Sequence, residues 1–317
     1  MTQKSMKEAI KDFYWNYNGR KLALGVGCGW LGLTPPHEAF VETERALLMK
    51  SYEAGMRFYD TSRTYGDSEL SVGAFIREID RKSIFLATKS KLLISGGFDT
   101  FKSNFYDSFE RLNTDYIDLY QIHDTNRYDV CIDEAIPFLI ERKKEGMIRY
   151  LGMATRSLIA HSQAIANGYV DSVLSYLDYN LAKKSALQVM EMAGQHNVAF
   201  INASVLLFGL LKGDSSSEAG YKYRMLGLSQ TGFINQLKKL CDDMKINIVE
   251  ASLQYSLLNP DIDMTLNGLK RLSNLESTIS AIENPLYPEQ WAAIEALQRT
   301  CASINIMDEF CEPVEQE

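Results

Sequence analysis

The feature that most constrains the fold of this chain is a regular alternation between short apolar segments and longer segments with helical periodicity. Continuous or alternating apolar runs are typical of strands, whereas apolar residues spaced three or four apart indicate helices. The strand-like segments are Lys21–Cys28, Arg57–Ser62, Ser83–Ser90, Tyr116–His123, Ile148–Thr155, Ser172–Leu177, Val198–Ser204 and Asp263–Gly268. Helical patterns cover Ala39–Ala54, Ser68–Ile79, Thr100–Leu112, Asp133–Lys144, Ser157–Asn167, Ser185–His196, about 231–244, 248–257, Asn274–Ile282 and about 288–301.

This order gives eight strand–helix units, which predicts a parallel sheet because a parallel connection needs a crossover helix. Eight consecutive units fit a closed (β/α)8 barrel, or TIM barrel, better than an open doubly wound sheet. We expect one domain over residues 1–317, with an N-terminal extension at about 1–20 and an acidic C-terminal tail at about 303–317. The long polar segment 212–230 interrupts the alternation, and loops of this length often form lids or binding loops.

Charge and cysteine usage exclude several classes of protein. The net charge of −8 disfavours a nucleic-acid binder, which needs a basic face. Five scattered cysteines without a C-x-x-C pair argue against a disulfide framework and a zinc site, and fit a reducing compartment. The longest strongly apolar run, Val205–Leu211, is too short to cross a bilayer, and the first residues lack the apolar core of a secretory signal. We therefore expect a cytoplasmic protein without a membrane or nucleic-acid partner, as a monomer or small homo-oligomer.

The stretch from Gly27 to Gly32 matches G-x-G-x-x-G and follows a predicted strand, as in open dinucleotide-binding folds. In those folds the third glycine leads directly into a helix whose N-terminus binds pyrophosphate. Here Leu33-Thr34-Pro35-Pro36 intervenes before the helical pattern begins. We therefore interpret the motif as a glycine-rich loop of the first barrel unit, with Trp30 in the core or in the wall of a pocket.

Four polar residues fall at or just after the ends of three consecutive predicted strands. Asp60 ends the second strand and Tyr65 follows it, Lys89 ends the third strand, and His123 ends the fourth. Reactive groups of (β/α)8 barrels lie at the carboxyl ends of the strands, so the four side chains are expected at one face.

This set suits proton transfer at a carbonyl or alcohol oxygen. A phenol titrates near pH ~10. An adjacent ammonium favours the phenolate. Lys89 can supply that cation, Asp60 can orient Lys89, and His123 can orient the substrate oxygen. The carbon atom needs a hydride partner that side chains cannot supply, which implies a nicotinamide cofactor.

Two other readings of the same residues are open. Lys89 at a strand end can form a Schiff base, although this leaves Tyr65 with little to do. His123 and Asp124 with Asp60 can bind a metal ion, although the chain has four histidines and no pair with metal-ligand spacing. We predict no metal.

At this point the chain resembles the aldo-keto reductase family. The matching segments, in the family's order, are YDTSRTYGDSELSVG (59–73), FLATKS (85–90), DYIDLYQIHD (115–124), KKEGMIRYLGMAT (143–155), NASVLLFGLLKG (202–213) and TLNGLKRLSNLES (265–277). The last two look most similar to the aldose 1-dehydrogenase branch, which oxidises sugars at C1. The resemblance implies a barrel that binds NADPH or NADH across its carboxyl-terminal face, with Tyr65 as general acid/base, Asp60 and Lys89 tuning it, and His123 orienting substrate.

The resemblance also implies cofactor contacts, at some positions with a different residue from the usual one. The residues that it points to are Gly27, Asp60, Thr155, Tyr176, Ser204, Leu206, Gly209, Gly268, Lys270, Arg271, Asn274 and Thr278, while Trp30, Tyr65 and His123 are expected to contact substrate. The family's Ser-Asn after strand five is Ala154-Thr155, and its Gln after strand six is Tyr176. Its stacking Tyr after strand seven is Ala203. Tyr176 is therefore expected to supply the aromatic surface for the nicotinamide.

Lys270 and Arg271 stand where a ribose 2′-phosphate would lie, which favours NADP(H) slightly over NAD(H). Asn274, at the position of a family arginine, argues the other way. The predicted substrate is a small carbonyl compound or sugar. A second function also fits the resemblance, namely a catalytically weak nucleotide-binding barrel that regulates a partner protein.

Overall fold

The computed structural model describes residues 4–33, 37–92, 97–123, 131–212 and 229–301, and within these ranges eight parallel strands close into a barrel. The strands are β3 (Leu24–Gly27), β4 (Phe58–Asp60), β5 (Phe85–Lys91), β6 (Ile117–His123), β7 (Ile148–Ala154), β8 (Ser172–Tyr176), β9 (Ala199–Ala203) and β10 (Met264–Gly268). They neighbour one another in chain order, and β10 pairs with both β9 and β3. The predicted (β/α)8 barrel is therefore confirmed.

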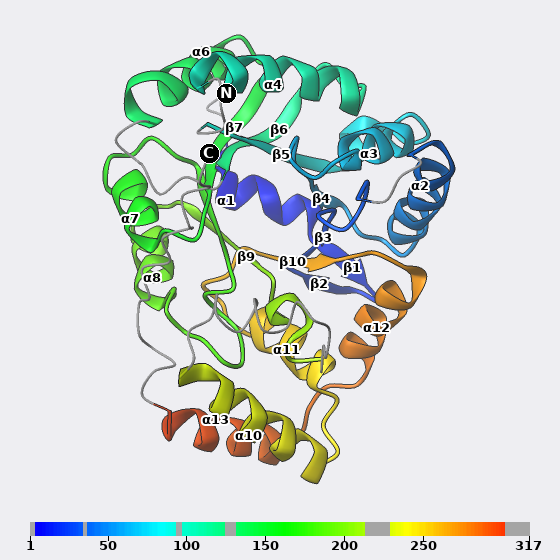
Figure 1. Cartoon of the computed structure of the whole chain (residues 1–317), viewed down its shortest axis with the longest axis vertical. Helices are drawn as coiled ribbons and strands as arrows, with labels where there is room; N and C mark the ends of the chain where they lie inside the picture. Colours follow the sequence, from blue (N-terminus) through cyan, green and yellow to red (C-terminus); the bar gives the residue numbers. More distant parts are fainter. Residues whose placement is uncertain (1–3, 34–36, 93–96, 124–130, 213–228, 302–317) are drawn as a thin grey trace.

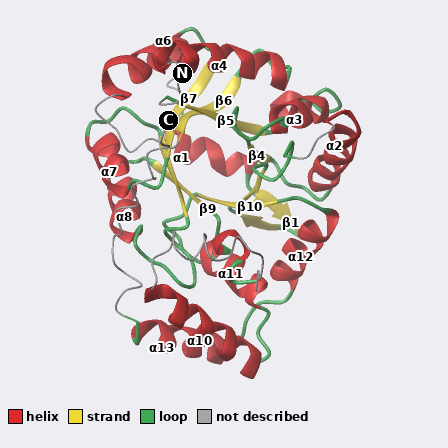
Figure 2. Cartoon of the chain, in the orientation of Figure 1, coloured by secondary structure: helices red, strands yellow, loops and turns green. Residues whose placement is uncertain are grey.

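Helices surround this barrel, and the two that span 229–243 and 288–299 pair with each other farther from the strands (Figures 1 and 2). The helices are α2 (His37–Glu53), α3 (Ser68–Ile76), α4 (Gly97–Leu112), α6 (Ile136–Lys144), α7 (Leu158–Ala166), α8 (Leu187–Gln195), α10 (Ser229–Asp243), α11 (Ile248–Leu257), α12 (Leu272–Glu283) and α13 (Pro288–Arg299). A π-helical turn, Cys131–Ala135, leads into α6. The start of α12 lies before the expected one because the side chain of Asn274 caps the helix, accepting hydrogen bonds from the backbone N–H groups of Lys270 and Arg271.

The first predicted strand, Lys21–Cys28, is divided in the structure. Its beginning belongs to an antiparallel hairpin, in which β1 (Trp15–Tyr17) pairs with β2 (Arg20–Leu22), and the barrel strand β3 starts only at Leu24. The apolar pattern continues across both pieces, so periodicity alone does not separate them.

The N-terminal residues close one end of the barrel. A short helix, α1 (Met6–Ala9), and the 3-10 turn Ile10–Phe13 place the buried side chains of Met6 and Ile10 against the barrel interior. That interior is formed by inward-facing side chains of the strands, among them Phe58, Phe85, Leu119, Ile201 and Met264. Figure 1 shows α1 lying across the middle of the barrel. The carboxyl ends of the strands lie at the opposite end of the barrel, which this segment does not cover.

A second apolar cluster lies beside the barrel and supports the segment after β9. Leu207, Leu210 and Leu211 pack there with side chains of α10 and with Ile294 of α13. Within this segment Ser204, Leu207 and Phe208 have positive φ angles of 57°, 51° and 53°, which non-glycine residues rarely adopt. The packing of Leu207 and Leu210 therefore holds a strained backbone in place at the rim of the barrel.

The N-terminal segment that closes the barrel, Met6–Phe13, gives a stability prediction. Ile10→Ala removes buried apolar atoms from the barrel floor and should lower the free energy of unfolding by about 2–5 kcal/mol. Urea unfolding followed by circular dichroism measures this difference. The exposed neighbour Lys11, changed to Ala, is the matched control and should change stability by less than about 0.5 kcal/mol. Equal, small effects of both substitutions would contradict a structural role for Ile10.

Candidate active site

The chain positions its polar residues by strand register at the carboxyl end of the barrel. Alternation along β5 and β6 turns Lys89, Gln121 and His123 to the interior, and Lys89 is the register partner of Gln121. Gly27 on β3 is the register partner of Asp60. Asp60, Lys89 and His123 line a cavity of about 630 Å³ together with Tyr65 from the loop after β4. The structure thus brings the four predicted catalytic residues together.

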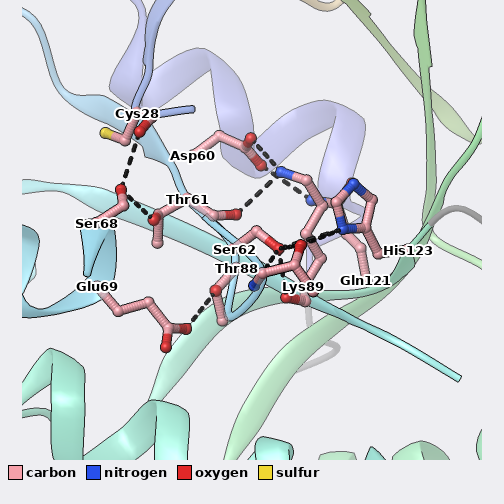
Figure 3. Close-up of polar contacts among 11 residues, drawn as sticks. Cys28, Asp60, Thr61, Ser62, Ser68, Glu69, Thr88, Lys89, Gln121 and His123 are labelled. Carbon is pink, nitrogen blue, oxygen red and sulfur yellow. Dashed lines mark hydrogen bonds and ion pairs between the residues drawn. The ribbon is translucent and has the colours of Figure 1, made fainter. Parts of the chain in front are cut away.

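Asp60 and Lys89 form a buried ion pair at the bottom of this cavity (Figure 3). Their side chains are 5% and 2% exposed, so water screens the two charges little. The Lys89 Nζ atom also donates to the backbone carbonyl of Thr61 over 2.9 Å, and it lies 5.0 Å from the ring centroid of Tyr65. The second carboxylate oxygen of Asp60 accepts from Gln121 Nε2 at 3.0 Å.

Burial and partner charges act in opposite directions on this pair. Burial lowers the pKa of Lys89, but the Asp60 carboxylate and the nearby Tyr65 hydroxyl outweigh burial and hold that pKa above its ordinary value. Burial raises the pKa of Asp60, and the Lys89 ammonium and the Gln121 amide oppose this rise. Lys89 is therefore a charged ammonium beside the phenol, a state that suits tuning of Tyr65. A Schiff base needs the neutral amine, so this ion pair argues against that alternative.

His123 stands with its ring at right angles to Tyr65. The two ring centroids are 5.6 Å apart and the interplanar angle is 90°. His123 Nδ1 lies 3.2 Å from Ser62 Oγ and 3.1 Å from Thr64 Oγ1. Ser62 Oγ also donates to the carbonyl of Lys89. The hydroxyls of Ser62 and Thr64 thus link the imidazole to the loop that carries Tyr65. Figure 3 shows the other ring nitrogen turned away from these hydroxyls.

The loop that carries Tyr65 is fixed by contacts on both sides. Arg111 of α4 donates to the carbonyl of Gly66 at 2.7 Å and to the Asp67 carboxylate at 2.9 Å. On the other side, Gly32 packs so closely that a Cβ atom there would lie 2.1 Å from Ser68 N, and Gly32 also has a positive φ of 69°. Only glycine fits this crossing of two loops.

These contacts also explain the G-x-G-x-x-G match. The backbone N–H of Gly32 donates to the Glu44 carboxylate at 2.8 Å and 3.1 Å. In a phosphate-binding loop that N–H would face the pyrophosphate. Gly32 therefore serves loop packing, and the motif lies in the first loop of a barrel rather than at the start of a phosphate-binding helix.

Most residues predicted to bind cofactor or substrate line the same cavity. They are Gly27, Trp30, Asp60, Tyr65, His123, Tyr176, Ser204, Leu206, Gly209, Gly268, Lys270, Arg271, Asn274 and Thr278. Thr155 is not among the described residues that line it. Its hydroxyl accepts from Ser157 N at the start of α7, and its carbonyl contacts His161 Nε2 at 2.9 Å. The acidic C-terminal tail and most of the long polar segment 212–230 lie outside the described residues.

Several lining residues were not expected from the sequence. They are Gly29, Thr64, Lys91, Ala154, Leu174, Ala203, Val205, Phe208, Lys212, Val249, Leu253, Leu266, Asn267 and Ser277. Strand periodicity could have found Lys91, which follows Lys89 by two positions and pairs in register with His123. The same rule would have found Gln121, two positions before His123. The contribution of α11 through Val249 and Leu253 has no signal in the local sequence.

A profile of the Aldo/keto reductase family matches residues 23–299, which include the whole barrel. The chain belongs to this family. It is 27% identical over 282 residues to L-galactose dehydrogenase of Arabidopsis thaliana, covering 85% of this chain and 84% of that protein. It is 24% identical over 275 residues to D-threo-aldose 1-dehydrogenase of Pseudomonas sp, covering 76% and 84%. The solved structure of aldo-keto reductase AKR11C1 from Bacillus halodurans (holo form) shares its fold, with a TM-score of 0.70, 23% identity, and coverage of 90% and 95%.

Family membership implies NAD(P)H-dependent carbonyl reduction, and the cavity fits such a dinucleotide. Lys212, Lys270 and Arg271 line the cavity and supply positive charge for a phosphate-bearing cofactor. Within the described ranges no helix is long and apolar enough to cross a membrane. Among the same residues no cluster of three or more His, Cys, Asp or Glu side chains is arranged to hold a metal ion.

The ion pair gives a prediction that does not depend on activity. Lys89→Met leaves the Asp60 carboxylate buried without its cation, which should lower the free energy of unfolding by about 3–5 kcal/mol at neutral pH. The folded-state pKa of Asp60 then rises further above its unfolded value. The stability of this variant should therefore be highest at acidic pH and fall as pH rises through that folded-state pKa. Urea unfolding at several pH values measures both effects.

The double variant Asp60→Asn, Lys89→Met removes both charges and should recover most of the lost stability. Lys102→Met is the control for the loss of a lysine, since its exposed pair with Asp99 contributes little. A Lys89→Met protein whose stability does not change with pH would contradict the buried pair.

Proposed function

We propose that this protein is an NAD(P)(H)-dependent oxidoreductase that transfers hydride to or from a carbonyl or alcohol carbon, with Tyr65 as the general acid/base. The observation that carries the proposal is the buried Asp60–Lys89 pair, whose ammonium lies 5.0 Å from the ring centroid of Tyr65 at the cavity floor. A protein that only binds nucleotide has no need of a buried charge pair beneath a phenol.

Each side chain has a distinct part in the reaction. In reduction, the Tyr65 hydroxyl gives its proton to the carbonyl oxygen, and the Lys89 ammonium stabilises the phenolate that remains. Asp60 keeps Lys89 charged and oriented. His123 holds the substrate oxygen beside Tyr65, and its ring is itself fixed by Ser62 and Thr64. In oxidation the same groups act in reverse. The nicotinamide, when bound, supplies or accepts the hydride.

The cofactor is proposed to be NADP(H) in preference to NAD(H). Lys270 and Arg271 are exposed beside the cavity at the start of α12, where a 2′-phosphate can meet both side chains. Their own N–H groups already donate to Asn274 Oδ1, so these side chains, rather than these two amides, would bind the phosphate. Tyr176, which lines the cavity 6.4 Å from Phe208 between ring centroids, is proposed to face the nicotinamide.

The substrate is proposed to be an aldehyde, a ketone or an aldose. The likeness to two sugar dehydrogenases supports the aldose. We also propose a cytoplasmic location, supported by Cys28 and Cys241, which are buried and form no disulfide.

Turnover separates this proposal from a regulatory barrel. Aldehydes and aldoses should be screened with NADPH, NADH and their oxidised forms, with absorbance of the reduced nicotinamide as the measurement. Tyr65→Phe removes only the hydroxyl and should lower kcat at least about 100-fold, because it deletes the general acid/base. Binding of NADPH should change less than about threefold. If the wild type and Tyr65→Phe bind NADPH equally and neither turns over any substrate, the regulatory function is favoured instead.

The cofactor preference has its own test. Lys270→Ala and Arg271→Ala should each weaken NADPH binding by roughly tenfold, because each removes a charged partner of the 2′-phosphate. NADH lacks this phosphate, and its dissociation constant should stay within twofold. Fluorescence titration of both cofactors measures the two values, with the exposed Lys82→Ala as a matched control. Equal weakening of NADPH binding and NADH binding would show that the two side chains do not recognise the phosphate.

A further inference from the structure

Gln121 lies one layer below His123 on the interior face of β6. It is fully buried, between Leu119 and His123 on the same face, and its register partners are Lys89 on β5 and Gly152 on β7. Its amide Nε2 donates to Asp60 Oδ2 at 3.0 Å, while the other carboxylate oxygen of Asp60 meets Lys89 (Figure 3). The two oxygens of Asp60 are thus held by two different strands.

The other end of the same amide is unsatisfied. Gln121 Oε1 is buried and has no hydrogen-bond partner among the described residues, and the same is true of Ser172 Oγ on β8. Both side chains flank Gly152, where a Cβ atom would lie 3.0 Å from Gln121 Cγ and 2.5 Å from Ser172 Oγ. An unpartnered buried oxygen costs free energy that an apolar side chain of similar size would avoid. Core packing alone therefore does not account for a glutamine here.

The carboxylate fixes which way the amide faces. If Gln121 were turned over, its Oε1 atom would point at Asp60 Oδ2, and two acceptors would repel each other. With Nε2 toward Asp60, the amide donates to the ionised carboxylate and prevents it from rotating. Such a bond to a charged group is stronger than one between neutral groups.

We propose that Gln121 is a positioning residue of the reaction, whose amide keeps Asp60 ionised and turned toward Lys89 so that the ammonium stays against Tyr65. This inference rests on the proposed function of Tyr65 as general acid/base. Gln121 itself does not line the cavity among the described residues, so it acts through Asp60 and Lys89 rather than on substrate.

The electrostatic setting gives the direction of the effect. Burial raises the pKa of Asp60, and the Gln121 amide is one of the groups that oppose this rise. Without the amide, Asp60 holds less negative charge, and Lys89 loses part of the interaction that keeps it protonated. Tyr65 then loses help from the ammonium and titrates at higher pH. Among the described residues, the other titratable groups around the pair are Cys28, directly after β3, and His123 from β6.

Two variants test the inference, Gln121→Leu and Gln121→Met. Both replace the amide with an apolar side chain of similar volume, and the two side chains differ in shape. Each should lower kcat by about tenfold and leave the dissociation constant of NADPH within twofold, because Gln121 is not among the described residues that line the cavity. The acidic limb of the pH profile for alcohol oxidation should move to higher pH. Ser90→Ala is the matched control, since the Ser90 hydroxyl contacts Tyr120 on the outer face of the same two strands, at 2.8 Å.

A second measurement does not need turnover. Each protein is compared with a partner variant that also carries Tyr65→Phe. The ultraviolet difference spectrum between the two reports the titration of Tyr65 alone. It should move to higher pH in Gln121→Leu and Gln121→Met and stay in place in Ser90→Ala. Folded variants with an unmoved Tyr65 titration, or with an unmoved pH profile, would overturn the inference. A wild type that binds NADPH without turnover would overturn the proposed function alone, and the Tyr65 titration would still decide the role of Gln121.

Discussion

The site depends on one interaction, the contact between the Asp60 carboxylate and the Lys89 ammonium inside the barrel. Burial of either charge alone is costly, because the interior cannot solvate an ion as water does. The two charges are held together by β4 and β5, so the closed sheet makes their burial tolerable. The pair in turn places a permanent cation beside Tyr65, and a phenol needs such a neighbour to exchange protons at neutral pH.

Barrel closure explains why residues distant in sequence act as one group. Hydrogen-bond register on β4, β5 and β6 brings Asp60, Lys89 and His123 to the same end, and Tyr65 enters from a loop that Arg111 and Gly32 hold from opposite sides. The opposite wall of the cavity is built in the same way, from the ends of β8, β9 and β10 and the first turns of α12. Each strand contributes one to three residues to the cavity wall, and none of the strands forms a site alone.

Much of the fold could be predicted because strand and helix periods differ and alternate cleanly here. The four catalytic candidates could be predicted as well, because the carboxyl ends of the strands in a (β/α)8 barrel are where its reactive groups lie. Other features depend on contacts that no local pattern contains. Pairing of β1 with β2 in a hairpin divides the first predicted strand. The packing of α11 places Val249 and Leu253 in the cavity wall. The hydroxyl of Thr155 accepts a hydrogen bond from Ser157 N at the start of α7, a contact that the strand pattern does not contain.

The floor of the barrel has a consequence for how the chain folds. The first described residues contact strands from most of the chain, for example through the hydrogen bond from the Tyr150 hydroxyl to the carbonyl of Lys4 and the ion pair of Lys7 with Asp263. Synthesis proceeds from the N-terminus, so this segment leaves the ribosome long before β10 exists to receive it. Its docking joins residues that are far apart in the chain, such as Lys7 and Asp263, and contacts of this kind form slowly. The segment is thus made before the strands that it covers, and it cannot close the barrel floor until they have formed.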